Sequence, residues 1–541
     1  MQKIQSLKWK VVLPLSILLF SVTVYGQNQL VRGPYLNSGT PTSMVVRWRT
    51  AQAEVGKLIY GTDQQSLSDT LVASGSETDH EFLVNGLQSG TDYFYRVAGE
   101  DTIYTPADSS FYFRTSPISG TATPTRIWAI GDFGNGSQAQ LDVKTGYTEH
   151  FGDVHTDIWM WLGDNAYGDG TDQEYQEKVF EVYPEVFKNS VVWPTPGNHD
   201  YGSIDFFNNG PYYDIMTLPT NGEAGGLPSG EEGYYSFDYG NIHFLSLNTE
   251  YLLWIALPGT GFQDWLEQDL QNTTADWIIC FFHQPAYSKG SHDSDDFGSR
   301  PVLMRQNVLP LLEEYGVDMV LNGHSHSYER SYLINGHYGT SDTWDPSTML
   351  IDGTNGNPND AGPYEKYQNG MQQNVGAVYS VVGCSGQKGS GNSPLNHPVM
   401  YMSTEDYHGS MVIDIDSLVL NAKFIDTTGA VLDEFAIVKL PGESSTGISY
   451  NTNSQTELTV YPNPFRDEFK IDFKVAEKTD AMVKVMTVEG SLLDRFVFNS
   501  IMPNETKSIT YRPKSIPSNG ILLVEIQTGS GISTKRLVRV Q

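Results

Sequence analysis

The sequence predicts a multidomain protein in which a central α/β domain lies between two small β-sandwiches. Three observations predict this arrangement. The chain has 541 residues, too many for one hydrophobic core at about 150 residues per domain. Short alternating strands mark both ends, whereas longer helical stretches separate the apolar strands of the middle. Linker-like stretches rich in Ser, Thr, Pro and Gly, at residues 116–125 and 441–457, divide these regions.

Residues 1–26 are expected to be a signal peptide. Three lysines precede an apolar run at positions 11–24, and small residues follow it as a cleavage site. The alternative is a membrane anchor, but the run is shorter than the ~20 residues that a span needs. We therefore expect an exported protein with no transmembrane segment after cleavage.

The charge of the chain limits its partners. It has 33 basic and 64 acidic residues, so the formal net charge is −31. Such a surface repels nucleic-acid polymers and anionic lipid. Small phosphorylated substrates remain compatible with it, because bound metal ions reverse the field locally. Export would allow Cys280 and Cys384 to pair, but both adjoin apolar strands and are equally compatible with buried thiols.

Residues 27–116 are predicted to form the N-terminal β-sandwich. Alternating segments at 44–49, 93–97 and 111–114 are separated by clusters of Gly, Ser and Asp. Nothing in this region groups as catalytic residues.

Residues 126–440 are predicted to form an α/β domain with buried strands. We expect strands at 127–130, 158–162, 191–193, 242–247, 277–282 and 319–321, and helices at 263–270 and 301–315. Residues 336–374 are rich in Gly, Asn, Asp and Pro and are expected to form a long loop or insertion beside the site.

Five short motifs in this domain carry residue types that bind metal ions. They are Gly131-Asp132-Phe133-Gly134, Gly163-Asp164-Asn165-Ala166-Tyr167, Gly197-Asn198-His199-Asp200, His283 and Gly323-His324-Ser325-His326. Four of the five directly follow predicted strands, and open α/β sheets bind ligands at the carboxyl ends of their strands. Carboxylate, phenolate, amide oxygen and imidazole suit iron, zinc or manganese.

The ligand candidates are too many for one open four-coordinate ion but suffice for two ions that share a carboxylate. They are Asp132, Asp164, Tyr167, Asn198, His283, His324 and His326. Asp164 is the natural bridge, since it lies between the other ligand groups in sequence. Each motif alone has an ordinary explanation, such as a turn aspartate or a buried histidine. The ordered set therefore carries the prediction of a two-metal site.

This ordered set resembles the calcineurin-like metallophosphoesterase superfamily and, within it, the purple acid phosphatases. Relatives outside the purple group usually carry a histidine where Gly134 stands, and they lack the tyrosine that is present here as Tyr167. The resemblance covers roughly residues 30–440. It implies a four-layer αββα central domain preceded by a fibronectin-III-like domain.

The resemblance also implies a role for each residue. A first ion, usually Fe(III), would take Asp132, Asp164, Tyr167 and His326, and a second, divalent ion (Fe, Zn or Mn) would take Asp164, Asn198, His283 and His324. His199 and His292 would contact the phosphate, and Asp200 is expected to orient His199. The implied enzyme is an acid phosphatase that hydrolyses phosphate monoesters by attack of a metal-bound hydroxide.

Two alternatives remain open at this point. A phosphodiesterase or nucleotidase could use the same metal site. Outside the enzymes, the chain could be a cell-surface binding protein with a vestigial phosphoesterase domain, although such a domain has no physical need to keep a complete ligand set.

Residues 458–541 are predicted to form a last β module, with strands at 469–475, 482–486, 522–526 and 537–540. Its opening, Tyr461-Pro462-Asn463-Pro464-Phe465, and its basic end resemble the C-terminal sorting domain of type IX secretion. The resemblance implies secretion machinery as a partner and a secreted or outer-surface location. The alternative is an ordinary accessory β-sandwich.

Overall fold

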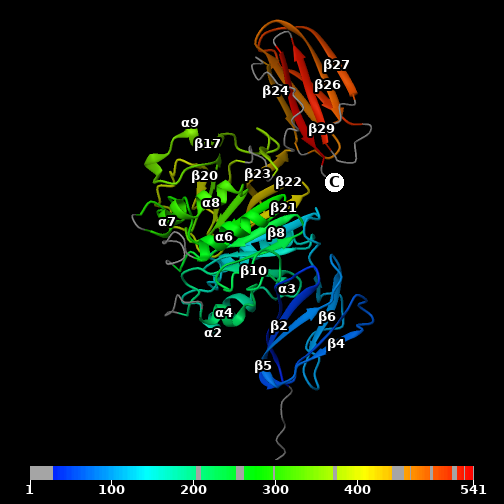
Figure 1. The fold of residues 1–541 in the computed structure, drawn as a ribbon, viewed down its shortest axis with the longest axis vertical. Helices are drawn as coiled ribbons and strands as arrows, with labels where there is room; N and C mark the ends of the chain where they lie inside the picture. Colours follow the sequence, from blue (N-terminus) through cyan, green and yellow to red (C-terminus); the bar gives the residue numbers. More distant parts are fainter. Residues whose placement is uncertain are drawn as a thin grey trace, which may run out of the picture.

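A computed structural model describes residues 28–202, 209–251, 261–296, 299–368, 375–440, 456–463, 465–487, 492–513, 521–528 and 531–539. The expected signal peptide, residues 441–455 of the second linker and Pro464 lie outside these described residues. The chain forms an N-terminal β domain, a central α/β domain and a C-terminal β domain (Figure 1). Within the described ranges, no helix has the length and apolar character needed to span a membrane.

The N-terminal domain is made of strands in two sheets. They are β1 (Leu30–Asn37), β2 (Ser43–Glu54), β3 (Lys57–Gly61), β4 (Asp69–Val72), β5 (Glu77–Asn85), β6 (Asp92–Ala98) and β7 (Tyr112–Arg114). Strands β4-β3-β6-β7 form one sheet, whereas β1, β2 and β5 extend the larger sheet of the central domain. Leu36 on β1 pairs in parallel with Val191 on β10 (Val191–Thr195). This pairing covers a sheet edge and makes the first domain continuous with the second.

Two mixed sheets form the central domain. The larger sheet adds to these three N-terminal strands β8 (Thr125–Ile130), β9 (Ile158–Leu162), β10, β18 (Tyr364–Tyr367), β21 (Gly409–Asp416), β22 (Val419–Asp426) and β23 (Val431–Leu440), in the order β18-β23-β22-β21-β8-β9-β10-β1-β2-β5. The smaller sheet has the order β11-β12-β13-β14-β19-β15-β20, with β11 (Tyr235–Tyr239), β12 (Ile242–Ser246), β13 (Trp277–Phe281), β14 (Met319–Asn322), β15 (Tyr328–Ser331), β19 (Val378–Val382) and β20 (Met400–Thr404). Strands β8, β9 and β10 run parallel, as do β12, β13 and β14, so their carboxyl ends lie together.

Alternation along the buried strands explains how the layers stack. On β13, Ile279 and Phe281 enter the core that also contains Trp161 of β9, whereas Ile278 and Cys280 face a second core. Helices α6 (Gly261–Asn272), α7 (Arg300–Asn307) and α8 (Leu309–Glu314) cover that second core. Helix α1 (Gln138–His150) packs on β21 and β22 at the opposite face. The central domain is therefore layered helix, sheet, sheet, helix.

Two expectations for the central domain differ from the structure. The single helix expected at 301–315 is broken at Val308 into α7 and α8, because Pro310 has no N–H and fits only the first turn of a helix. The described part of 336–374 is not one long loop but contains η2 (Ser341–Thr343), α9 (Pro346–Met349), β17 (Leu350–Asp352) and β18. Strand β17 pairs with β16 (Leu333–Ile334), and β18 forms the edge of the larger sheet. The other short helices within the described residues are α2 (Asp172–Tyr175), the π-helical turn η1 (Gln176–Phe180), α3 (Pro184–Phe187) and α4 (Pro211–Ile215).

The two cysteines are both free and buried. Burial raises the pKa of the Cys384 thiol to about 12 and that of Cys280 well above its ordinary value. Both side chains therefore pack as small apolar groups.

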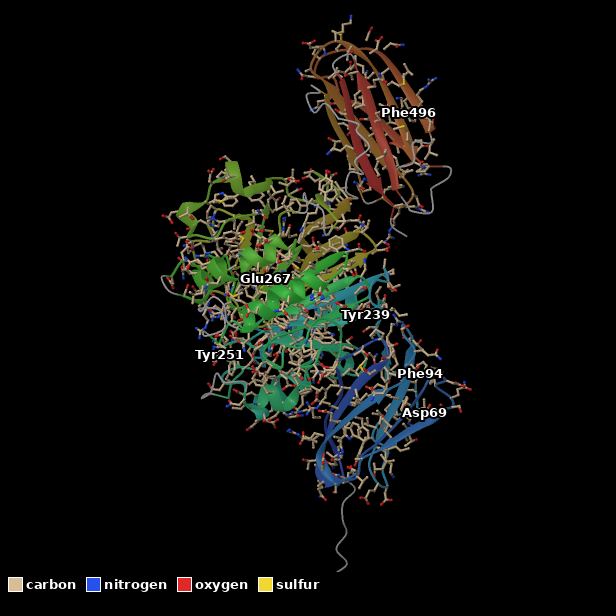
Figure 2. The ribbon with its side chains drawn as sticks, in the orientation of Figure 1. Asp69, Phe94, Tyr239, Tyr251, Glu267 and Phe496 are labelled. Carbon is tan, nitrogen blue, oxygen red and sulfur yellow. The ribbon has the colours of Figure 1, made fainter. Side chains whose placement is uncertain are left out.

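The C-terminal domain encloses a core of its own. Its strands are β24 (Thr456–Tyr461), β25 (Phe469–Val475), β26 (Thr479–Thr487), β27 (Leu492–Ile501), β28 (Lys507–Tyr511), β29 (Ile521–Thr528) and β30 (Gly531–Val538). They form the sheets β24-β25-β28 and β27-β26-β29-β30. Figure 2 shows Phe496 on β27, which packs against this core, far from Phe94 in the N-terminal domain.

Candidate metal centre

Loops at the carboxyl ends of strands from both sheets bring the predicted ligands together. The loops follow β8, β9, β10, β13 and β14, and they carry Asp132, Asp164, Tyr167, Asn198, His283, His324 and His326. Strand β10 extends to Thr195, two residues beyond the predicted end, so Asn198 lies close behind it. The site therefore occupies the edge where the parallel strands of both sheets end.

The first group of ligand atoms surrounds the phenol oxygen of Tyr167. Its Oη lies 2.9 Å from Oδ1 of Asp132, 3.1 Å from Oδ2 of Asp164 and 3.4 Å from Nε2 of His326. Nε2 of His326 lies 3.5 Å from Oδ1 of Asp132. Two carboxylates, a phenol and an imidazole thus meet at one point.

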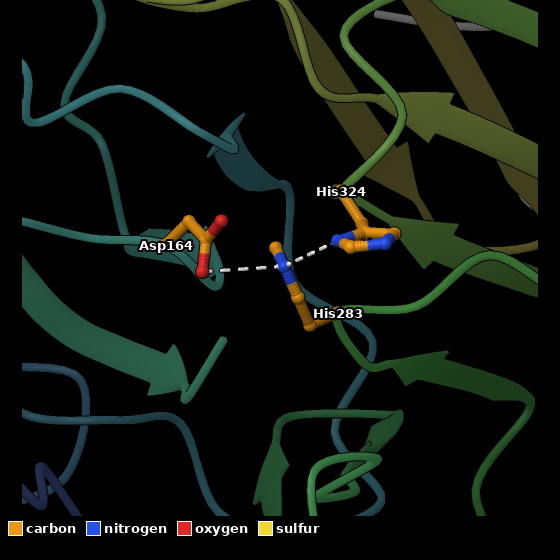
Figure 3. Close-up of side chains that lie close together, drawn as sticks. All are labelled: Asp164, His283 and His324. Carbon is orange, nitrogen blue, oxygen red and sulfur yellow. Dashed lines mark hydrogen bonds and ion pairs between the residues drawn. The ribbon is translucent and has the colours of Figure 1, made fainter. Parts of the chain in front are cut away.

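The second group surrounds Nε2 of His283. This nitrogen lies 3.2 Å from Oδ1 of Asn198, 3.3 Å from Oδ1 of Asp164 and 3.2 Å from Nδ1 of His324. Figure 3 shows Asp164, His283 and His324, whose ligand atoms all lie within 4.8 Å of one another. Asp164 belongs to both groups, with Oδ2 toward Tyr167 and Oδ1 toward His283. This is the position of a carboxylate that can bridge two cations.

Three of the ligand residues have an unusual backbone conformation. The φ angles of Asp132, Asp164 and His324 are 54°, 50° and 64°, in the left-handed region that costs L residues roughly 1–2 kcal/mol each. Strain of this kind clusters at functional sites. At the neighbouring Gly163, with φ 87°, a Cβ atom would lie 2.5 Å from Nδ1 of His283. Only glycine therefore allows the loop after β9 to approach this histidine.

Backbone groups fix the orientation of the ligands. The carbonyl of Leu162 accepts a 2.9 Å hydrogen bond from Nδ1 of His283, which leaves Nε2 to face the other ligands. The amide of His324 donates to Oδ2 of Asp132 at 2.8 Å, and the amide of His199 donates to Oδ1 of Asp164 at 2.8 Å. These contacts hold the carboxylates while their remaining lone pairs face the centre.

Asp200 joins two of the ligand loops. It is fully buried and accepts hydrogen bonds from donors in both loops and from a nearby helix, namely the amides of Asn165, Ala166 and Gly197 and the hydroxyl of Tyr175. Among the contacts of the described residues there is none between Asp200 and the His199 ring, so the expected orienting role is wrong. Nδ1 of His199 instead donates to the carbonyl of Gly168 at 2.5 Å. The motif Gly197-Asn198-His199-Asp200 alone does not indicate that Asp200 joins two loops, because that role depends on contacts with residues distant in sequence.

Both histidines expected to contact phosphate lie beside the ligand groups. The His199 ring lies 4.7 Å from the Tyr167 ring, and its Nε2 is 3.9 Å from Oδ2 of Asp164. The His292 ring lies 4.0 Å from that of His324 and 5.7 Å from that of His326. The His199 side chain is 40% exposed and His292 is exposed, so both are within reach of a ligand from solvent.

The electrostatics of the centre suit cations. Asp132 and Asp164 are 0% and 2% exposed, and within the described ranges only histidines form ion pairs with them. Burial opposes charge on both partners, but Asp164 raises the pKa of His283 to about 10, and His283 lowers the pKa of Asp164. A buried carboxylate is costly without a compensating positive charge, and the raised pKa of His283 reflects that need. Iron, zinc or manganese ions fit this set of oxygen and imidazole donors and would offset that cost.

Three protein families match separate parts of the chain. Residues 32–115 match the N-terminal domain of purple acid phosphatases, and residues 125–328 match the calcineurin-like phosphoesterases. Residues 459–541 match the C-terminal sorting domain of a secretion system.

Curated relatives include plant and animal phosphatases. Purple acid phosphatase 23 of Arabidopsis thaliana is 28% identical over 359 residues, which is 54% of this chain and 73% of the relative. Purple acid phosphatase 18 of the same plant is 27% identical, and the match spans 56% of this chain but only 63% of the relative. Acid phosphatase type 7 of Mus musculus is 26% identical, over 55% of this chain and 69% of the relative.

Solved structures share the fold. The purple acid phosphatase PPD1 from yellow lupin (Lupinus luteus) seeds aligns with a TM-score of 0.57 at 18% identity, covering 76% of this chain and 74% of that chain. The structure of PhoD aligns with a TM-score of 0.51 at 14% identity, covering 76% of this chain and 92% of that chain.

Proposed function

The chain is a purple acid phosphatase-like phosphoester hydrolase of the calcineurin-like superfamily with a C-terminal secretion sorting domain, and from this premise we propose that it hydrolyses phosphate monoesters at a two-metal centre outside the cell. The observation that supports this most is the division of ligand atoms around Asp164. Its Oδ2 faces Tyr167, whereas its Oδ1 faces His283. One buried carboxylate thus serves two separate groups of donors.

The two donor groups differ in chemistry. Asp132, Asp164, Tyr167 and His326 would hold the first ion, for which the phenolate favours Fe(III), and Asp164, Asn198, His283 and His324 would hold a divalent ion of iron, zinc or manganese. When bound, such a pair of ions supplies a nucleophile near neutral or acidic pH and withdraws charge from the attacking and leaving oxygens. Backbone hydrogen bonds to Asp132, Asp164 and His283 support this division, because they orient these side chains toward the centre.

His199 and His292 are proposed to act on the phosphate itself. Both rings lie beside the ligand groups on their accessible side. As imidazoles they can donate hydrogen bonds to phosphate oxygens, and one of them can protonate the leaving alkoxide. The proximity of His292 to His324 suits it for the leaving-group side.

A comparison of monoesters with diesters tests the proposed substrate class. Purified protein should turn over 4-nitrophenyl phosphate with a higher kcat/KM than bis(4-nitrophenyl) phosphate. A preference for the diester would favour the phosphodiesterase alternative. Absence of turnover of either compound by protein with bound metal would favour a binding protein.

The C-terminal domain is proposed to direct the protein to the secretion machinery. Its sequence match begins at residue 459, and its strands form a core separate from that of the catalytic domain. Deletion of residues 458–541 should leave the enzyme in the periplasm with its activity intact. Unchanged secretion of the truncated chain would rule out the sorting role.

A further inference from the structure

A buried carboxylate lies beneath the loop that carries His292. Glu329, on β15, is 0% exposed. Its Oε1 accepts hydrogen bonds from the hydroxyls of Ser288, at 2.5 Å, and Ser327, at 2.9 Å. Its Oε2 accepts the amide of Lys289 at 3.1 Å. One carboxylate therefore contacts both the segment before His292 and the segment after His326.

Further hydroxyl groups join the same two segments. Oγ of Ser325, between the two histidines of the last motif, lies 2.8 Å from Oγ of Ser288 and 3.1 Å from Oγ of Ser327. The amide of Gly290 donates to Oγ of Ser288 at 3.1 Å. All three serine side chains are buried, where a hydroxyl left without a hydrogen-bond partner is unfavourable. These buried hydrogen bonds therefore fix the position of residues 288–290 relative to residues 325–329.

Gly290 allows the two segments to approach closely. A Cβ atom at this position would lie 2.4 Å from Oγ of both Ser325 and Ser327, and 2.9 Å from Oε1 of Glu329. Real Cβ atoms do not approach so closely, so any larger residue would push residues 288–292 away from the loop that carries His324 and His326. The close packing at Gly290 sets the distance between His292 and the ligands.

Ser291 transmits this position to the imidazole. Its Oγ accepts the amide of His326 at 2.8 Å and lies 3.1 Å from Nδ1 of His292. The hydroxyl can accept from or donate to Nδ1, so it is compatible with the charged and the neutral ring. Nε2 of His292 remains as the ring nitrogen available to a substrate.

We propose that Glu329 is a positioning residue for His292. By holding residues 288–292 against the loop of His324 and His326, it directs Nε2 of His292 toward the oxygen of the leaving group. As the phosphorus–oxygen bond breaks, the proton moves from Nε2 to the departing alkoxide, which leaves as the alcohol, and the neutral imidazole regains a proton from water. This inference rests on the proposed phosphatase activity and deepens it.

A pair of matched variants tests the role of Glu329. Glu329→Gln removes the charge and keeps the shape, and Glu313→Gln is its control. Glu313 is also buried and also accepts hydrogen bonds from two hydroxyls and one amide, those of Tyr379, Tyr338 and Gly336. Among the described residues, it has no hydrogen bond or ion pair with a residue of the site. Glu313→Gln should therefore leave the catalytic constants unchanged.

Substrates with different leaving groups distinguish a positioning role of Glu329 from a general structural defect of the variant. Phenolate needs protonation more than 4-nitrophenolate does, so Glu329→Gln should lower kcat for phenyl phosphate by up to about 100-fold and for 4-nitrophenyl phosphate by clearly less. In a His292→Ala background, where no proton donor remains at this position, the further loss from Glu329→Gln should disappear. Elemental analysis should find the wild-type metal content in both variants.

Several outcomes would overturn the inference. They are an equal loss for both substrates, a loss that adds fully to that of His292→Ala, a loss of bound metal, or a loss no larger than that of Glu313→Gln. Should Glu329→Gln fail to fold, Ser291→Ala at an exposed position provides the same comparison, and no difference between the substrates would then refute the proposal. A wild-type protein that binds metal without turning over any monoester would instead refute the proposed function.

Discussion

Nε2 of His283 lies 3.3 Å from Oδ1 of Asp164, although Asp164 follows β9 of the larger sheet and His283 follows β13 of the smaller sheet. The pair therefore exists only because the two sheets pack face to face with their carboxyl ends at one edge. Stability and metal binding are linked through this contact, since the ligands assemble only in the folded domain.

The close approach of the β9 loop to His283 depends on Gly163. A Cβ there would lie 2.5 Å from Nδ1 of His283, so Gly163→Ala should displace the imidazole and lower kcat by at least about tenfold. Gly86→Ala is the control, because Gly86 also has a positive φ, of 75°, but has open space around it. If both variants showed the same fall in kcat, the cause would be backbone strain and not the contact with His283.

The phenol of Tyr167 should give the loaded protein a visible colour. Its Oη lies among two carboxylates and an imidazole, so a ferric ion in this group would take it as phenolate and show a charge-transfer band. Tyr167→Phe should abolish the band, whereas Tyr147→Phe, at a buried tyrosine bonded to Thr156, should keep it. A colourless oxidised wild-type protein with a full iron complement would exclude Tyr167 as a ligand.

Replacement of Asp200 should destabilise the two ligand loops that its carboxylate joins. An amide group in Asp200→Asn would place donor hydrogens against the amides of Asn165 or Gly197. We expect the free energy of unfolding to fall by roughly 2–4 kcal/mol, measured by denaturant titration. The exposed Asp214→Asn should change it by less than about 0.5 kcal/mol. An Asp200→Asn protein as stable as wild type would contradict the role assigned to these bonds.

Alkaline pH should destabilise the fold through His243. This buried ring lies between Asp238 of β11 and Asp269 of α6, 2.8 Å from each. Burial favours the neutral ring, but the two carboxylates prevail and raise the pKa of His243 to about 9. The stabilisation, roughly 3 kcal/mol, is full below the unfolded pKa near 6.5 and is lost as pH rises through 9.

The slope of unfolding free energy against pH between 6.5 and 9 measures this effect. His243→Gln should flatten the slope, because the amide does not titrate. An unchanged slope in that variant would assign the pH dependence to other groups.

Local pattern predicts the strands and the ligand motifs well. The segment at 469–475 alternates in sequence, and it is a strand with Phe469, Ile471 and Phe473 buried. Likewise the motifs that contain Asp132, Asp164 and His324 stand directly behind strands. Period-two hydrophobicity and glycine-flanked polar residues are local signals, so a single sequence carries them.

Contacts between residues far apart in the sequence could not be predicted from local patterns. The parallel contact between Leu36 and Val191 joins strands about 150 residues apart, and no local pattern distinguishes it from an independent sandwich. In the same way, Glu329 looks like one charged residue of a strand until folding brings Ser288 and Lys289 to its carboxylate. Residues that position others depend on such contacts.

Metal stoichiometry tests the central claim most directly. Elemental analysis of the purified chain should find two transition-metal ions per molecule, and Asp164→Ala should bind neither, because both donor groups lose a shared ligand. An Asp169→Ala control, at an exposed carboxylate in the same loop, should keep both ions. Two ions retained in Asp164→Ala, or a single ion in the wild-type protein, would contradict a centre bridged by Asp164.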